Sequence, residues 1–240
     1  MEQNQQLTVV YAADRNLYDK FPTVLNSLFT NNPTAKVYLF IEDDSIDYIT
    51  HPNVTFKNLN MFKDYILPSS PQKDYYLPWI TFIRLWMCEV IPESRVLWLD
   101  VDTIVDKDLT DLWNTDLEDN IVAGVLDQGY TCYPQITRFY INAGVLLMDL
   151  DKWRALKYNN RSRYLVNVKA WQFGDQDIIN LLCRDKVLYL NCRYNYGRFI
   201  CRDGLTRPIK IYHWPGHPKA WESVDEFDKW LWMKYYTEKI

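Results

Sequence analysis

The sequence Val-Leu-Trp-Leu-Asp-Val-Asp-Thr-Ile-Val, residues 96–105, decides the fold that we expect. Its apolar first half is typical of a buried strand, and the apolar run ends abruptly in two carboxylates, Asp100 and Asp102. Burying two anions at the end of a core strand is costly unless a cation offsets them. Oxygen ligands favour Mn²⁺ or Mg²⁺, and such ions usually serve a substrate phosphate.

Two aspartates at this spacing are more often a turn or a cap than a ligand site. Here apolar residues lead directly into the pair, and ligands of open parallel sheets bind beyond the carboxyl ends of the strands. Asp106 and Asp108 repeat the spacing without a core strand before them, and Asp108 is better interpreted as a helix N-cap. We therefore place the candidate site at Asp100 and Asp102.

Strand and helix patterns alternate along the rest of the chain. Apolar runs read as strands at 7–12, 37–41, 54–59, 121–126, 144–148, 187–190 and 209–212. Apolar residues recur at helical spacing over 17–29, 78–91 and 175–182. Ser223 and Glu226 predict a capping box at the start of a C-terminal helix over about 223–238. We interpret residues 1–240 as one α/β domain, with a mainly parallel sheet flanked by helices.

The composition excludes some classes of protein. Of the 240 residues, 48% are hydrophobic, which is enough for a full core. The net charge of −4, without a basic block, argues against a nucleic-acid binder. The five cysteines include no C-x-x-C pair, which favours free thiols in a reducing compartment. With no signal peptide or membrane span visible, we expect a cytoplasmic protein, with peripheral association at the inner membrane face left open.

A second group of polar residues follows another apolar strand. His213 comes directly after the run at 209–212, as Asp102 follows its own strand, and Gly216 and Lys219 lie in the same loop. Glycine permits a tight turn, and a lysine ammonium suits a phosphate. A single histidine is more often a core residue, but this combination indicates a third metal ligand and a phosphate clamp.

Two further groups are weaker on their own. Asn142, Ala143 and Gly144 precede an apolar strand, where small residues allow a ligand to approach the backbone closely. The amide of Asn142 offers both a donor and an acceptor, although the group alone is only a turn signal. Asp175 and Gln176 open a helix, where capping alone explains a carboxylate.

The D-x-D, N-A-G, D-Q-D and H-x-x-G-x-x-K elements, in this order, resemble glycosyltransferase family 8, retaining enzymes of the GT-A fold that use nucleotide sugars. The resemblance extends from about Thr8 to Trp221. It implies a Rossmann-like α/β domain. It also implies metal-dependent transfer of a hexose, glucose or galactose, from a UDP-sugar to a glycan, lipid-linked or protein acceptor.

The resemblance also implies roles for individual residues. Asp100, Asp102 and His213 resemble the ligands of Mn²⁺ or Mg²⁺, and Gly216 and Lys219 resemble the diphosphate clamp. Other residues resemble donor contacts: Ala12, Asp14 and Asn16 for uridine, Arg84 for sugar and phosphate, Val101 within the donor-binding set, and Asp127, Asn142, Ala143 and Asp175 for the sugar.

The candidate catalytic residues are Gln176, which resembles a residue near the anomeric face, and Asp175. Because the sequence offers no indisputable carboxylate nucleophile, we favour attack from the leaving-group face, with the leaving phosphate oxygen accepting the proton. One departure from the family pattern is Ala220, which stands where proline is usual and loosens the loop around Lys219.

Two other functions are open alternatives. A haloacid-dehalogenase-like phosphatase also places D-x-D after an apolar strand, and Asp100 would then be its nucleophile. That motif usually opens the core fold, however, and this reading leaves His213 and Lys219 unexplained. The other alternative is a non-catalytic UDP-sugar binder on the same fold.

Overall fold

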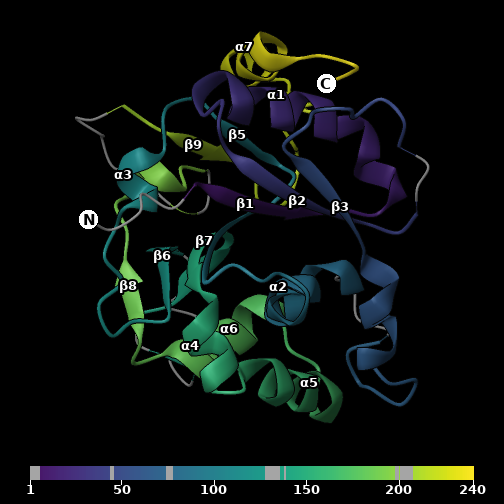
Figure 1. Cartoon of the computed structure of the whole chain (residues 1–240), viewed down its shortest axis with the longest axis vertical. Coiled ribbons are helices and arrows are strands. Elements are labelled where there is room, and N and C mark those ends of the chain that lie inside the picture. Colours follow the sequence, from purple (N-terminus) through teal and green to yellow (C-terminus); the bar gives the residue numbers. More distant parts are fainter. Residues whose placement is uncertain are drawn as a thin grey trace.

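The computed structural model of the chain describes residues 6–43, 46–73, 78–127, 136–137, 139–197, 200 and 208–240. Within these residues a seven-stranded sheet forms the centre, in the order β3-β2-β1-β4-β7-β6-β8 (Figure 1). Its strands are β1 (Thr8–Ala12), β2 (Lys36–Ile41), β3 (Val54–Asn58), β4 (Arg95–Leu99), β6 (Val122–Leu126), β7 (Ile141–Asp149) and β8 (Val187–Tyr189). A separate two-stranded sheet pairs β5 (Thr103–Val105) with β9 (Ile211–His213).

The main sheet is mostly parallel, as predicted. Strands β1, β2, β3 and β4 pair in parallel, and so do β6 and β8. Strand β7 runs antiparallel to both of its neighbours, β4 and β6. Because of this reversal the amino end of β7 lies beside the carboxyl end of β4, and the Asp100 amide donates to the Gly144 carbonyl at 2.8 Å. The strand direction therefore brings the N-A-G residues to the D-x-D turn.

Helices cover both faces of the sheet. In Figure 1, α1 (Phe21–Asn31), α7 (Glu226–Tyr235) and the small β5–β9 sheet lie on one side, with α2 (Ile83–Trp86), α4 (Leu150–Ala155), α5 (Tyr158–Val168) and α6 (Asp175–Cys183) on the other. A short α3 (Thr110–Trp113) follows β5. Short 3-10 helices complete the described elements: η1 (Arg15–Lys20), η2 (Leu59–Tyr65), η3 (Trp79–Phe82), η4 (Met87–Glu89) and η6 (Cys192–Tyr194).

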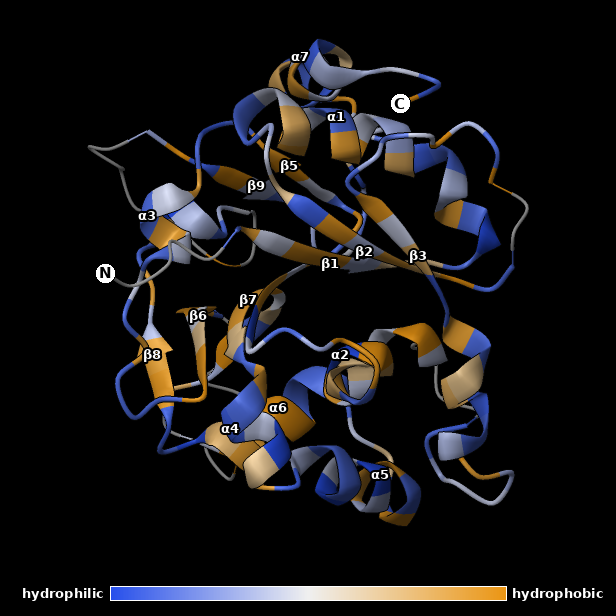
Figure 2. Ribbon diagram, in the orientation of Figure 1, coloured by the Kyte–Doolittle hydropathy of each residue, from blue (hydrophilic) through white to orange (hydrophobic). Residues whose placement is uncertain are grey.

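The core is divided in two by the sheet. Successive strand side chains point to opposite faces, so Val9 and Leu97 belong to one buried cluster, and Val10 and Trp98 to the other. Strands buried on both faces are near-continuously apolar, which is why they could be predicted from the sequence. Figure 2 shows this apolar character along the strands, whereas α5 at the edge of the molecule is largely hydrophilic.

The C-terminal helix differs from its prediction. It spans Glu226–Tyr235, which is shorter than 223–238. The predicted capping box is wrong, because the N-cap is Asp225, whose carboxylate accepts from the amides of Phe227 and Asp228 at 2.9 and 3.1 Å. The Ser223 hydroxyl instead donates to the Asp228 carboxylate at 2.7 Å. Aspartate is at least as good an N-cap as serine, so pattern alone did not separate the two.

Other differences lie in the central part of the chain. The segment after Pro78 is divided into η3, α2 and η4 instead of one continuous helix. The residues Asn142–Gly144 lie inside β7 and do not precede it. Helices α4 and α5 and the three-residue strand β5 were not predicted, since α5 is polar overall and β5 is too short for a periodic signal.

The cysteines follow the prediction only in part. Cys88 and Cys183 are free and buried. Cys192 is disulfide-bonded, which contradicts the expectation of a free thiol at that position. Cys132 and Cys201 lie outside the described residues.

Across the described ranges, we find no helix with both the length and the apolar character needed to cross a membrane. A cytoplasmic location remains a prediction.

Candidate active site

The candidate site lies where the main sheet and the small sheet meet. Asp100 follows β4, and a tight turn through Val101 leads to Asp102 and then β5. Strand β9 pairs antiparallel with β5, and the register places His213 opposite Thr103. The Trp214 amide donates to the Asp102 carbonyl at 3.1 Å, which extends the pairing by one residue. Backbone pairing therefore brings an imidazole from the end of the chain to the D-x-D turn.

The three side chains form one cluster. One ligand atom from each of Asp100, Asp102 and His213 lies within 4.8 Å of the others. The His213 Nε2 is 3.3 Å from Asp102 Oδ1 and 3.9 Å from Asp100 Oδ2. Asp102 and His213 are buried, whereas the Asp100 side chain is 28% exposed and opens the cluster to solvent. Two carboxylates and one imidazole suit Mn²⁺ or Mg²⁺, so the residues fit such an ion.

Lys219 approaches the same carboxylate from the loop after β9. Its ammonium contacts Asp102 Oδ2 and donates to the Trp214 carbonyl at 3.1 Å. Burial raises the pKa of Asp102, but the interactions with a protonated His213 ring and with Lys219 outweigh it and hold that pKa well below its usual range. Asp102 is therefore a carboxylate, the protonation state that a metal ligand requires.

The loop that carries Lys219 has its own supports. Gly216 adopts a φ of 75°, a left-handed conformation that favours glycine. The Glu222 carboxylate accepts from the Lys219 amide at 3.1 Å and contacts the His217 ring nitrogen at 2.8 Å. Ala220, which stands at the usual proline position, is buried. These contacts support the loop around Lys219.

Arg84 joins several candidate residues beneath the turn. It is 4% exposed, and its guanidinium donates to Asp100 Oδ1 and pairs with Asp175 Oδ2, both at 2.9 Å. It also donates to the Ala143 carbonyl and lies 4.5 Å above the Trp98 ring. The Trp98 Nε1 donates to Asp100 Oδ1 at 2.8 Å. Arg84 therefore orients Asp100 in this structure and is itself held by β7.

The two candidate catalytic residues are both engaged with the protein. Asp175 is buried, and burial raises its pKa to about 6, with Arg84 opposing the rise and Asp100 adding to it. Gln176 Oε1 accepts from the Ala143 amide at 2.8 Å, and Gln176 Nε2 donates to Asp127 Oδ2 at 3.3 Å. Neither side chain is arranged as an exposed nucleophile.

The predicted uridine contacts lie at the end of the neighbouring strand β1 and in the segment that follows it. Ala12 ends β1, which pairs in parallel with β4 at Val10 and Trp98, so both strands end at the same edge of the sheet. Asp14 caps η1, and its carboxylate accepts from the Asn16 amide at 3.0 Å. The structure thus brings Ala12, Asp14 and Asn16 to the edge that carries the D-x-D turn.

Sequence reasoning missed one residue of the site, Asn195. It is fully buried after η6, and its Oδ1 lies 2.9 Å from His213 Nδ1. Its Nδ2 donates to Asn142 Oδ1 at 3.0 Å, and Asn142 in turn donates to Asp127 Oδ2 at 3.0 Å. An asparagine between two tyrosines carries no motif, so no signal in the sequence distinguished it.

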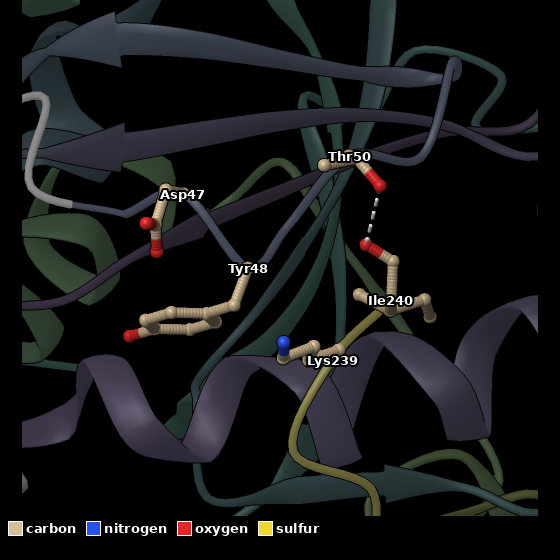
Figure 3. Close-up of a pocket in the computed structure, with 5 residues that line it drawn as sticks. All are labelled: Asp47, Tyr48, Thr50, Lys239 and Ile240. Carbon is tan, nitrogen blue, oxygen red and sulfur yellow. Dashed lines mark hydrogen bonds between the residues drawn. The ribbon is translucent and has the colours of Figure 1, made fainter.

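A separate pocket lies near the end of the chain (Figure 3). Asp47, Tyr48, Thr50, Lys239 and Ile240 line it, and the Thr50 hydroxyl contacts the Ile240 carbonyl at 3.5 Å. None of these residues belongs to the Asp100–Asp102–His213 cluster, so we do not assign this pocket to the site.

The fold and the position of the cluster together define a protein of the GT-A fold class. The profile of glycosyl transferase family 8 matches residues 8–225, and the chain belongs to this family. It is 29% identical to the glycosyltransferase GlyA of Streptococcus pneumoniae serotype 4, over 93% of this chain and 33% of GlyA. The chain thus spans about a third of that relative.

Solved structures agree with this assignment. The galactosyltransferase LgtC, in complex with donor and acceptor sugar analogues, superposes with a TM-score of 0.73 at 25% identity, over 96% of this chain and 97% of LgtC. The glycosyltransferase GlyE of Streptococcus pneumoniae superposes with a TM-score of 0.75 at 25% identity, over 96% of this chain and 60% of GlyE. Membership of family 8 argues against the alternative of a haloacid-dehalogenase-like phosphatase.

Proposed function

We propose that this chain is a metal-dependent, retaining hexosyltransferase that moves glucose or galactose from a UDP-sugar to a glycan, lipid-linked or protein acceptor. One observation carries the proposal: carboxylates from the end of β4 and an imidazole from β9 meet within 4.8 Å at the sheet edge. That edge is where open α/β sheets bind nucleotides. The likeness to LgtC, which was solved with donor and acceptor sugar analogues, supports the same reading.

Charge stabilisation is the chemistry that this site would supply. Breaking the anomeric carbon–oxygen bond places negative charge on the departing diphosphate. A divalent ion held by Asp100, Asp102 and His213 would supply positive charge against that diphosphate. Lys219 would add a second positive charge from a loop held by Glu222. Arg84 would keep Asp100 oriented from below.

We propose that configuration is retained because the acceptor hydroxyl attacks the anomeric carbon from the leaving-group face. The Asp175 carboxylate is buried against Arg84, and the Gln176 amide is bound to β7 and Asp127. Both are therefore better suited to holding the donor sugar than to forming a bond with it. A leaving phosphate oxygen would accept the acceptor hydroxyl proton. Isolation of a covalent glycosyl adduct on Asp175 would overturn this step.

The deciding experiment screens UDP-sugars by thermal shift and calorimetry, with and without Mn²⁺. We expect selective stabilisation by one UDP-hexose, greater with the ion, because a ligand that binds the folded state raises its stability. Transfer to sugar acceptors is then assayed with that donor. Binding without turnover on any acceptor would favour the non-catalytic binder. No response to any UDP-sugar would overturn the proposal, and hydrolysis of phosphate esters without a sugar donor would favour the phosphatase.

A further inference from the structure

We propose that Asn195 is a positioning residue that keeps the His213 ring proton on Nδ1 and so leaves Nε2 free for a cation. The inference rests on the metal site of the proposed function and adds a residue to it. Asn195 is fully buried and lies between His213 and Asn142. A ligating histidine commonly donates its other ring nitrogen to a fixed partner, and that partner sets the tautomer.

A backbone group fixes which atoms donate and which accept in the hydrogen bonds between Asn142, Asn195 and His213. The Gly144 amide can only donate, and it donates to Asn142 Oδ1 at 2.9 Å. The Asn195 group that faces the same oxygen, at 3.0 Å, must therefore be its NH₂. The Asn195 oxygen consequently faces His213 Nδ1, at 2.9 Å, and Nδ1 must carry the hydrogen.

The other end of Asn142 agrees with this polarity. Its Nδ2 lies 3.0 Å from Asp127 Oδ2, and a carboxylate accepts hydrogen bonds. Asn142 thus donates to Asp127 and accepts from Gly144 and Asn195. The relay Asp127–Asn142–Asn195–His213 therefore links a predicted sugar contact to the candidate metal ligands.

The tautomer matters because Asp102 competes for the proton. His213 Nε2 is 3.3 Å from Asp102 Oδ1, so without Asn195 the neutral ring would place its hydrogen on Nε2 and donate to that carboxylate. An Nε2–H group cannot bind a metal ion. The ring also has little freedom to turn, because it packs directly on the Gly144 backbone. The packing is so close that a Cβ added at Gly144 would lie 2.2 Å from His213 Cε1. Asn195 is thus the group that biases the ring toward the metal-binding form.

The direct test records the tautomer by ¹⁵N NMR of the histidine rings in metal-free protein. The chain has three histidines, so His213→Gln assigns the signal. We expect the neutral His213 ring to carry its proton on Nδ1 in the wild type and on Nε2 in Asn195→Leu. A neutral wild-type ring that carries its proton on Nε2 would overturn the proposal without any variant being needed.

A second measurement determines the affinity for Mn²⁺ by calorimetry. Asn195→Leu should weaken it by roughly 10- to 100-fold. Asn195→Asp loses the hydrogen bond to Asn142 Oδ1 but keeps an acceptor for Nδ1–H, so it should bind Mn²⁺ about tenfold more tightly than the leucine variant. If the Asn195 amide merely filled space, the buried charge of the aspartate would make Asn195→Asp bind Mn²⁺ more weakly than Asn195→Leu. Equal affinities of the leucine and aspartate variants would contradict the proposal.

Asn180→Leu is the matched control. Asn180 is also buried, and it bonds the Ile141 amide and carbonyl of β7 at 2.8 Å without contacting His213. The Asn180→Leu variant should lose thermal stability and keep its affinity for Mn²⁺. If Asn180→Leu lost as much Mn²⁺ affinity as Asn195→Leu, the effect of Asn195→Leu would be assigned to general destabilisation. If the wild type binds no Mn²⁺, the proposed function fails, whereas the tautomer measurement still decides the role of Asn195.

Discussion

The ammonium of Lys219 contacts the carboxylate of Asp102, one of the three side chains that form the candidate metal site. The lysine thus neutralises a buried anion that a divalent ion would otherwise offset. An arriving ion must compete with this contact, and the displaced ammonium would be available to a diphosphate.

Replacing Lys219 with methionine separates its two roles, the neutralisation of Asp102 and the binding of a diphosphate. We expect Lys219→Met to bind Mn²⁺ alone severalfold more tightly, because the competing cation is gone. It should bind UDP more weakly in the presence of Mn²⁺. Calorimetry measures both affinities. Lys234→Met is the control, since Lys234 pairs at 2.5 Å with Asp106 outside the site; weaker Mn²⁺ binding by Lys219→Met would contradict the competition.

Asp102→Asn should abolish the Mn²⁺-dependent part of donor binding. It removes a charged ligand from a buried position, so transfer activity should fall by roughly a hundredfold or more. Asp108→Asn is the comparison, because Asp108 belongs to the second D-x-D pair and accepts from the Thr110 amide at 3.0 Å outside the site; the N-cap of α3 is Leu109, so the predicted N-cap role of Asp108 is wrong. An unchanged Mn²⁺ response in Asp102→Asn would place the ion elsewhere.

Gly144→Ala tests the packing of the imidazole on β7. The added methyl would lie 2.2 Å from His213 Cε1, so the ring must move and Mn²⁺ affinity should fall by roughly tenfold or more. Gly124→Ala on the adjacent strand β6 meets the end of a flexible side chain, Ile141 Cδ1, at 2.8 Å. It should cost stability and leave the metal affinity intact. Equal Mn²⁺ affinity in both variants would refute this packing.

Asp175 predicts a pH dependence of stability in chelator-treated protein. Burial raises its pKa from 3.8 to about 6, with Arg84 opposing and Asp100 adding to the rise. The folded state therefore binds this proton more tightly than the unfolded state does. Stability should fall as the pH rises from about 4 to about 6, by on the order of 3 kcal/mol in total.

The control for this pH effect is Asp175→Asn, which cannot titrate at that position. Urea unfolding across the same pH range should show the wild type losing stability relative to the variant as the pH rises. Parallel curves for the two proteins would contradict a raised pKa at Asp175. Asp175→Asn also loses the ion pair with Arg84, which changes the stability of the variant at every pH. The comparison therefore uses the slopes of unfolding free energy against pH, not the absolute stabilities.

Some parts of the molecule could be predicted from the sequence because their physical cause is local. Strand β4 and its two aspartates stand out, because an apolar run that ends in anions has few stable explanations. The shorter or more polar elements could not be predicted in this way. Strand β5 has three residues and α5 is polar overall, so neither produces a hydrophobic period long enough to detect.

By itself, the sequence determined that the chain is an α/β protein, that Asp100 and Asp102 end a core strand, and that the family motifs occur in order, because these depend on local apolar patterning and residue type. Only the tertiary structure decided that His213 faces those aspartates, that Lys219 contacts one of them, and that Asn195 holds the imidazole. Those contacts depend on the antiparallel course of β7 and on the pairing of β5 with β9. Both are long-range backbone contacts, and the energy that selects them comes from burial across the whole core, not from any local stretch of residues.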